Sequence, residues 1–187
     1  MKKKIVVGVT GASGAVYAKR LIEKINARPD LIEKCDIVFS RQGIKVWEHE
    51  TGNFSETLFP NKVWPNDTFF APFASGSGDF DALIVCPCSM GTLGRIAAGT
   101  SNDLISRTAD VMLKERRKVV LVIREMPFNL IHINNMKTVT ESGGIIMPAS
   151  PSFYNHPESI DEMIDQTTDK ILNITGFTGF VKPWNFG

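Results

Sequence analysis

The stretch Val6-Val7-Gly8-Val9-Thr10-Gly11-Ala12-Ser13-Gly14 joins an apolar run directly to a glycine-rich turn. A continuous apolar run is typical of a parallel strand that is buried on both faces. Val119-Val120-Leu121-Val122-Ile123 is a second such run, and it stops at Arg124 and Glu125. Because ligands of open α/β sheets bind outside the carboxyl ends of the strands, we expect the residues after both runs to lie at a ligand-binding edge.

The rest of the chain alternates short apolar runs with stretches of helical periodicity. This pattern predicts repeated β-α-β units and therefore a three-layer, Rossmann-like α/β fold around a mostly parallel six-stranded sheet. The expected strands are 5–9, 37–39, 63–64, 83–86, 119–123 and 145–147, and the expected helices are 15–26, 42–51, 93–98, 104–115, 130–142 and 159–172. No repeat or linker divides the sequence, so 1–187 is expected to form a single domain.

Composition narrows the function classes. The 21 basic and 20 acidic side chains leave a net charge of +1, which argues against non-specific binding to nucleic acid or to a membrane surface. No apolar stretch approaches the roughly 20 residues that span a bilayer, and no signal-peptide pattern follows Met1, so a cytoplasmic location is expected. The three cysteines and three histidines lack metal-ligand spacing, so we expect no metal and reduced, buried thiols.

Three glycines, Gly8, Gly11 and Gly14, connect the first expected strand to the first expected helix. Glycines there let the backbone approach a ligand closely, and the amides of a helix N-terminus attract phosphate. The spacing differs from the G-x-G-x-x-G motif, and the second expected strand ends in Ser40-Arg41 instead of an acidic residue, which argues against NAD. A tight turn without a ligand is the alternative.

The segment Pro87-Cys88-Ser89-Met90-Gly91-Thr92 follows another expected buried strand. Its two hydroxyls and its backbone amides could contact a flavin ring or a phosphate, whereas Ser89 could equally be a simple helix N-cap. Further along, Arg107 and Lys114 lie two helical turns apart on nearly one face. They indicate an anion site or merely a solvated helix with ion pairs.

Two segments are less regular. Residues 65–80 are rich in Pro, Gly, Ser and Phe, and a loop of this length inside a domain is usually functional or disordered. The tail 176–187 carries four large aromatic side chains, so we expect it to pack on its own domain or on a neighbouring subunit.

Taken together, the motifs resemble those of the UbiX-type flavin prenyltransferases, a family that includes small subunits associated with phenolic-acid and hydroxyarylic-acid decarboxylases. The resemblance runs in order from Lys4 to about Leu172. It rests on the segments 8–15, 74–77, 86–92, 102–117, 124–128, 132–136 and 148–154.

This resemblance implies a metal-independent transferase that joins the dimethylallyl group of dimethylallyl monophosphate to N5 and C6 of reduced FMN. The product, prenylated FMN, would serve a UbiD-type decarboxylase as partner. The resemblance also implies a homo-dodecamer built from trimers, with active sites at subunit contacts.

Site residues follow from the same resemblance, position by position. FMN would be held by Gly11, Ala12, Ser13, Ser40, Ser89, Met90, Gly91, Thr92 and Arg124. The prenyl phosphate would be held or activated by Arg107, Lys114, Arg124, Glu125, Tyr154, Lys170 and Trp184. Ser13, Glu50, Glu125 and Tyr154 are the expected catalytic residues: Ser13 and Glu50 would move protons at the flavin, Glu125 would hold or protonate the phosphate, and the Tyr154 hydroxyl would stabilise it. Lys170 stands where some relatives have Arg, which keeps the charge but loses bidentate geometry.

Several alternatives stay open. Phe69, Phe73 and Trp184 could line a dry, π-rich pocket or could simply belong to the core. Glu125 could merely pair with Arg124. The chain could instead be an FMN-dependent peptidyl-cysteine-type decarboxylase or a non-catalytic flavin-binding subunit of a decarboxylase complex. The cationic set with Tyr154 favours the transferase.

Overall fold

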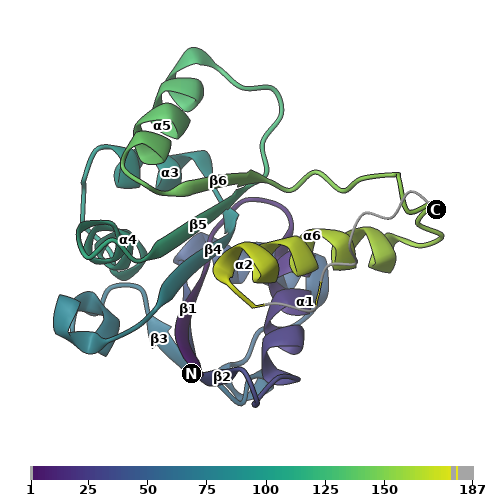
Figure 1. The fold of residues 1–187 in the computed structure, drawn as a ribbon, viewed down its shortest axis with the longest axis horizontal. Coiled ribbons are helices and arrows are strands. Elements are labelled where there is room, and N and C mark those ends of the chain that lie inside the picture. Colours follow the sequence, from purple (N-terminus) through teal and green to yellow (C-terminus); the bar gives the residue numbers. More distant parts are fainter. Residues whose placement is uncertain (1, 178–179, 181–187) are drawn as a thin grey trace.

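Six strands form one sheet in the order β3-β2-β1-β4-β5-β6, and all five pairings are parallel (Figure 1). The structure is a computed structural model that describes residues 2–177 and residue 180. The strands are β1 (Lys3–Val9), β2 (Ile32–Phe39), β3 (Lys62–Pro65), β4 (Ala82–Cys88), β5 (Lys118–Ile123) and β6 (Ile145–Pro148). The strand order reverses between β1 and β4, the point at which open α/β sheets bind their ligands.

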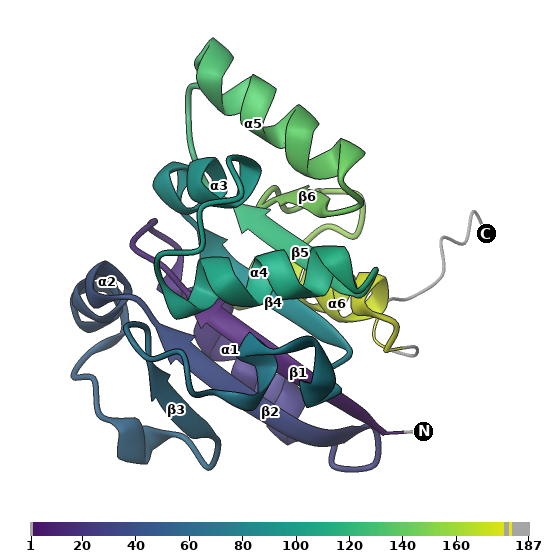
Figure 2. The same cartoon turned by 90° about the vertical axis from the view of Figure 1, so that its left-hand side faces the viewer.

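Helices cover both faces of this sheet, as the alternating pattern predicts. They are α1 (Ala15–Asn26), α2 (Arg41–Thr51), α3 (Met90–Ala97), α4 (Leu104–Lys114), α5 (Leu130–Glu141) and α6 (Ile160–Thr175). One core cluster joins the sheet to α1, α2 and α6, and a second joins it to α3, α4 and α5. Figure 2 shows α4 in front of the sheet and α1 behind it, so the expected three layers are confirmed.

The sequence places the start of β2 five residues too late, at residue 37 instead of Ile32. Pairing explains the difference, because β3 contacts β2 only from Asp36 onward. The first half of β2 therefore pairs only with β1 and tolerates Glu33 and Lys34, which interrupt the apolar run. In β1 and β5, where strands pair on both sides, the apolar run and the strand nearly coincide.

The segment 65–80 is an ordered part of the second core. It contains two short 3₁₀ helices, η2 (Pro72–Ala74) and η3 (Gly76–Gly78), and a third, η1 (Glu56–Leu58), precedes β3. Phe73 is buried with its ring edge-on to Trp64 and Phe80, whereas Phe69 is exposed. Phe73 is therefore a core residue rather than part of an open pocket.

The C-terminal region packs against the first core as far as it is described. α6 ends at Thr175, three residues beyond the expected end. Phe177 is buried with the Lys3 ammonium 5.3 Å from its ring centroid, and the Arg28 guanidinium lies 5.2 Å from that of Phe180. The other expected tail residues, including Trp184, lie outside the described residues.

An ion-pair network joins α1 to α6. Arg20 Nε lies 2.6 Å from Asp165 Oδ1, and Lys24 contacts both Asp165 and Asp169. The hydrogen bond from Arg20 lowers the pKa of Asp165 to about 2. The network fixes α6 against the helix that begins at the glycine-rich turn.

All three cysteines are buried, and burial raises the pKa of each thiol, that of Cys88 to about 12. The expectation of buried thiols is therefore confirmed. In the part of the chain that the structure describes, no helix is long and apolar enough to span a bilayer.

Candidate functional site

The turns that follow β1 and β4 are tied together at the carboxyl edge of the sheet. The Thr10 hydroxyl donates to the Pro87 carbonyl at 2.7 Å and accepts the Ser89 amide at 2.8 Å. The Thr10 amide also donates to the Pro87 carbonyl. One threonine thus fixes the glycine-rich turn against the Ser89 turn, so the two candidate ligand loops do lie side by side.

The first turn ends in a conformation that favours glycine, since Gly14 has φ +118°. Glu50, from the end of α2, receives the amides that begin α1: its Oε2 accepts from Gly14 N at 2.9 Å and from Ala15 N at 2.7 Å. We expected these amides to attract a phosphate. In the structure a carboxylate of the chain itself satisfies these two amides, whereas those of Gly11, Ala12 and Ser13 have no partner among the described residues.

The second turn, around Ser89, caps α3 and also contains backbone amides without a hydrogen-bond partner among the described residues. Ser89 Oγ accepts the Thr92 amide at 3.3 Å, which is the N-cap role considered from the sequence. The amides of Met90 and Gly91 have no hydrogen-bond partner among residues 2–177 and 180. Ser89 is therefore both a cap and part of a turn with free backbone donors.

The start of α2 borders the first turn. Ser40 caps this helix by accepting the Gly43 amide at 3.0 Å. A β-carbon on Gly11 would stand only 2.6 Å from Gln42 Cβ, so the turn and the helix approach as closely as glycine allows. This contact places Ser40 and Gly11 at the same edge.

Arg124 brings the end of β5 to the first turn, because its Nε donates to the Ser13 carbonyl at 3.1 Å. Ser13, Glu50 and Arg124 line one open cavity of about 530 Å³. Three residues singled out from the sequence are thus brought together. The cavity's other lining residues are Gly14, Val16, Tyr17, His49 and Ala149.

Sequence reasoning missed four of these lining residues, Val16, Tyr17, His49 and Ala149. Tyr17 lies one turn into α1, and burial raises the pKa of its phenol. His49 directly precedes Glu50, and Ala149 directly follows β6. The position of Ala149 after a strand that neighbours β5 was the one available signal, since side chains at that edge share the site.

Two of the expected phosphate ligands make other contacts, and Lys114 lies far from Arg124. Arg107 Nε donates to the Ala74 carbonyl at 3.1 Å, and Lys114 Nζ lies 2.5 Å from Glu115 Oε1. Lys114 ends α4 just before β5 begins, whereas Arg124 follows the end of β5. β5 spans about 20 Å at roughly 3.3 Å per residue, and Lys114 and Arg124 lie at its opposite ends. Within one chain the two side chains therefore cannot bind the same phosphate.

Three further expected ligands are exposed at the surface. Glu125 accepts the Met126 amide at 3.2 Å, while Arg124 donates to Ser13, so the two neighbours do not form the simple pair considered from the sequence. Tyr154 lies between β6 and α6, and Lys170 lies on α6. No cluster of three His, Cys, Asp or Glu side chains suited to a metal occurs in the described parts of the chain.

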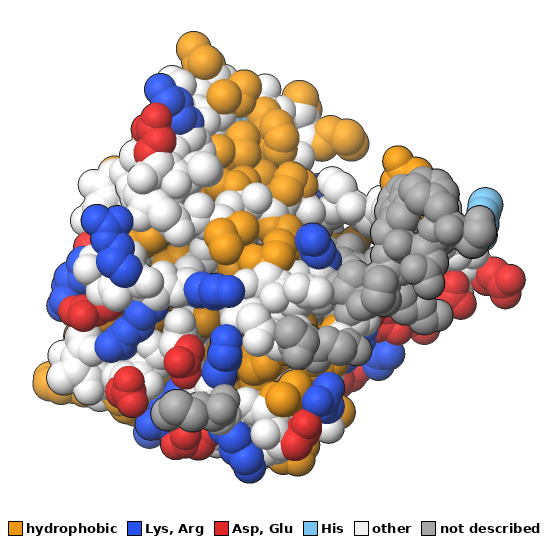
Figure 3. Space-filling view, in the orientation of Figure 1, with side chains coloured by type: hydrophobic (Ala, Val, Ile, Leu, Met, Phe, Trp, Pro, Cys, Tyr) orange, Lys and Arg blue, Asp and Glu red, His pale blue; other side chains and the backbone are white. Residues whose placement is uncertain are grey.

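An exposed apolar surface adjoins Glu125 directly. Its members are between 43% and 85% exposed: Met126, Phe128, Leu130, Ile131 and Ile133, here called the α5 patch. Figure 3 shows hydrophobic side chains gathered over α5. Contiguous apolar patches of this kind mark contacts with other molecules.

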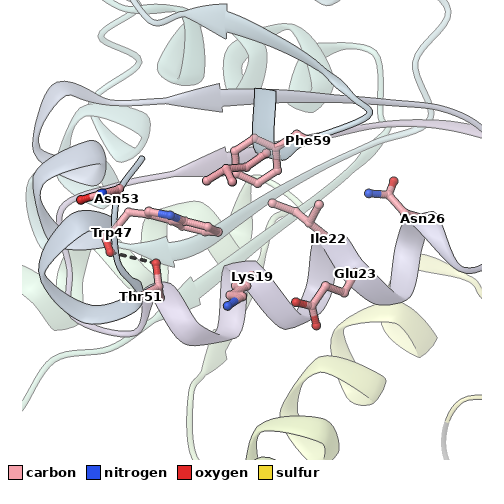
Figure 4. A pocket seen from close by; sticks show the side chains of 9 residues that line it. Lys19, Ile22, Glu23, Asn26, Trp47, Thr51, Asn53 and Phe59 are labelled. Carbon is pink, nitrogen blue, oxygen red and sulfur yellow. Dashed lines mark hydrogen bonds between the residues drawn. The ribbon is translucent and has the colours of Figure 1, made fainter. Parts of the chain in front are cut away.

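A second cavity, of about 270 Å³, lies between α1 and α2 (Figure 4). It contains none of the site residues expected from the sequence. It is lined by Lys19, Ile22, Glu23, Asn26, Trp47, Thr51, Asn53, Leu58 and Phe59.

Comparison with known proteins agrees with this geometry. The family model described as Flavoprotein matches residues 1–176. The chain is 42% identical over 184 residues to the flavin prenyltransferase UbiX of Methanocaldococcus jannaschii, covering 97% of this chain and 98% of that protein.

Among solved structures, the chain resembles AnUbiX (PadA1) in complex with FMN and dimethylallyl pyrophosphate, with TM-score 0.91 and 40% identity over 99% of this chain and 98% of that one. It also resembles a dodecameric FMN-dependent UbiX-like decarboxylase from Escherichia coli O157:H7, with TM-score 0.88 and 37% identity over 92% and 94%. The peptidyl-cysteine decarboxylase EpiD, at TM-score 0.62 and 14% identity, shares the fold alone. The chain therefore belongs to the flavoprotein family and, within it, to the UbiX-type flavin prenyltransferases.

Proposed function

We propose that this flavin prenyltransferase transfers the dimethylallyl group of dimethylallyl monophosphate to N5 and C6 of reduced FMN and releases prenylated FMN. The observation that carries the proposal is the convergence of Ser13, Glu50 and Arg124 on one open cavity at the carboxyl edge. A relative at 40% identity, bound to FMN and dimethylallyl pyrophosphate, supports the same ligand classes.

The residues of the carboxyl edge fit a flavin. The open amides of Met90 and Gly91 and the hydroxyls of Ser89 and Ser40 suit the acceptor atoms of FMN. Arg124 supplies a positive charge at the same edge. When bound, reduced FMN supplies the nucleophilic nitrogen and carbon that take the prenyl group.

The chain's own residues would then act on the prenyl phosphate. Breaking the allylic C–O bond leaves negative charge on the phosphate, and fixed cations stabilise that charge more in the transition state than in the ground state. Arg124 and Lys170 would provide the charge, Tyr154 a hydroxyl donor, and Glu125 would hold or pass a proton on the phosphate. Ser13 and Glu50 would move protons at the flavin, and both line the cavity.

We also propose that copies of the chain assemble into a homo-dodecamer whose sites lie at subunit contacts. The distance between Lys114 and Arg124 along β5 supports this, because a second copy can bring Lys114 to a site that one chain leaves without it. The α5 patch beside Glu125 offers the contact surface. A dodecameric relative at 37% identity supports the same stoichiometry.

The activity is tested by incubating the protein anaerobically with reduced FMN and dimethylallyl monophosphate and measuring the mass of the released flavin. A gain of one C5H8 unit is expected. Parallel reactions with the pyrophosphate ester report which phosphate ester is used. Unmodified FMN from folded, flavin-loaded protein under both conditions would overturn the proposal in favour of a flavin-binding subunit.

Assembly and product transfer have separate tests. Ile131→Asp should lower the mass of the particle and reduce prenylation. Leu58→Asp, at another exposed apolar position, on η1 and outside the α5 patch, should change neither. An Ile131→Asp protein of unchanged mass would contradict the contact. The released product should activate a UbiD-type decarboxylase that has been prepared without its flavin.

A further inference from the structure

Arg95, near the end of α3, contacts Thr92 in the first turn of the same helix. Its Nη2 donates to Thr92 Oγ1 at 3.0 Å and lies 3.2 Å from Asp103 Oδ2. Asp103 in turn caps α4 by accepting the Ser106 amide. Arg95 is thus placed between a turn expected to hold FMN and the start of the next helix.

Thr92 is the link between Arg95 and Ser89. Its hydroxyl is buried, and its hydrogen-bond partners among the described residues are Arg95 Nη2 and Ser89 Oγ, which lies 3.1 Å away. A guanidinium donates and cannot accept. The Thr92 proton therefore has one acceptor, the Ser89 oxygen.

The direction of the chain of hydrogen bonds follows. Ser89 Oγ accepts from the Thr92 hydroxyl and from the Thr92 amide at 3.3 Å, which uses both of its lone pairs. Its own proton is then left to point away from the turn. The Ser89 hydroxyl therefore serves as a donor. It is polarised by the Arg95 guanidinium, which is connected to it through two successive hydrogen bonds.

We propose that Arg95 is a positioning residue that fixes Ser89 as a hydrogen-bond donor toward an acceptor oxygen of FMN, acting through Thr92. The proposal rests on FMN binding at this turn, as proposed above. Packing alone does not explain an arginine here, because its Nε is buried without a partner among the described residues, and a buried unpaired donor costs stability.

A matched pair of variants tests the direction. Arg95→Lys keeps a charged, donor-only group, so its FMN affinity should stay within about twofold of the wild type. Arg95→Gln offers an acceptor to Thr92, so Ser89 can turn its proton inward. Its Kd for FMN should rise about tenfold, which corresponds to about 1.4 kcal/mol for one hydrogen bond.

The same change in a Ser89→Ala background separates this mechanism from a structural or charge effect. If Arg95 acts through Ser89, Arg95→Gln should change the Kd of Ser89→Ala by less than about twofold. An equal tenfold loss in both backgrounds, or no loss in either, would overturn the proposal. Asp103→Asn, which keeps the cap of α4 but removes the ion pair, should leave FMN affinity nearly unchanged. A tenfold loss in that variant would likewise assign the effect to the contact between α3 and α4.

Riboflavin locates the acceptor. A loss with FMN but not with riboflavin places it on the phosphate, and an equal loss with both places it on the ring or the ribityl chain. Unfolding midpoints without flavin identify variants that fail to fold. If Arg95→Gln is one of them, a tenfold loss of FMN affinity in Arg95→Lys or in Asp103→Asn would still overturn the proposal. Wild-type protein that binds no FMN would refute the proposed function itself, whereas binding that is insensitive to Arg95 would refute only this role.

Discussion

Replacing Glu50 with alanine should measurably weaken the start of α1. Its carboxylate accepts the amides of Gly14 and Ala15 at 2.9 and 2.7 Å, the N-cap and first helical residues of α1, whose amides have no partner within the helix. Loss of a cap costs about 0.5–2 kcal/mol, and loss of a negative charge at a helix N-terminus adds about 0.3–1 kcal/mol. Water can reach these amides through the open cavity, so we expect a total in the lower half of the combined range, about 1.5 kcal/mol.

For a chain of this length, about 1.5 kcal/mol lowers Tm by roughly 3–6 °C. Urea unfolding without flavin should show a lower midpoint and an unchanged slope. Glu50→Gln, which keeps an acceptor oxygen but no charge, should lose about half as much. Glu48→Ala is the matched control, because Glu48 is exposed on the same helix. Equal midpoints for Glu50→Ala and Glu48→Ala would refute the capping role.

Two further predictions concern stability. Asp165→Asn should cost about 1 kcal/mol at pH 7, a value discounted because the Arg20 pair is partly exposed. Since the folded pKa is about 2 against 3.8 unfolded, this contribution is complete above about pH 4 and is lost as pH falls through about 2, so the wild-type advantage should vanish there in urea unfolding series. Glu48→Gln, at an exposed carboxylate that forms no ion pair among the described residues, is the control, and a difference at Asp165 that persisted at pH 2 would contradict the linkage. Phe73→Ala should cost about 3–5 kcal/mol, whereas Phe70→Ala, at a position 95% exposed, should cost little. A loss below about 1 kcal/mol at Phe73 would mean that segment 65–80 is not part of the core.

The sequence predicted the fold where burial is uniform. β1 and β5 are buried and paired on both sides, so apolar runs mark them almost to the residue. The prediction failed where the pairing changes along a strand, as at the start of β2 at Ile32. There β2 pairs with β1 but not with β3, so polar residues are tolerated, and the local sequence pattern does not reveal which strands are neighbours. The segment 65–80 misled for a related reason, since its glycines and prolines form two short 3₁₀ turns around a buried Phe73.

The site was predictable in the same partial way. That Ser13 and Arg124 meet follows from parallel strands whose carboxyl ends share one edge. That Glu50 caps α1 does not follow, because the contact joins residues about 35 positions apart and depends on how α2 packs beside α1. Helical spacing correctly put Arg107 and Lys114 on one helix, but it carries no information about the end of the sheet at which each residue lies.

The use of backbone amides at the carboxyl edge decides where acceptor atoms of a flavin can bind. The amides of Gly14 and Ala15 are held by Glu50, and that of Ser89 is held by Thr10. Those of Met90 and Gly91 remain without partners among the described residues. The amides of Gly11, Ala12 and Ser13 are likewise without partners among the described residues. Because a ligand gains little from donors that are already satisfied, open backbone donors for a flavin lie in both turns, before Gly14 in the first and at the start of α3 in the second. The glycines of the first turn also permit close packing, with Gly11 against α2.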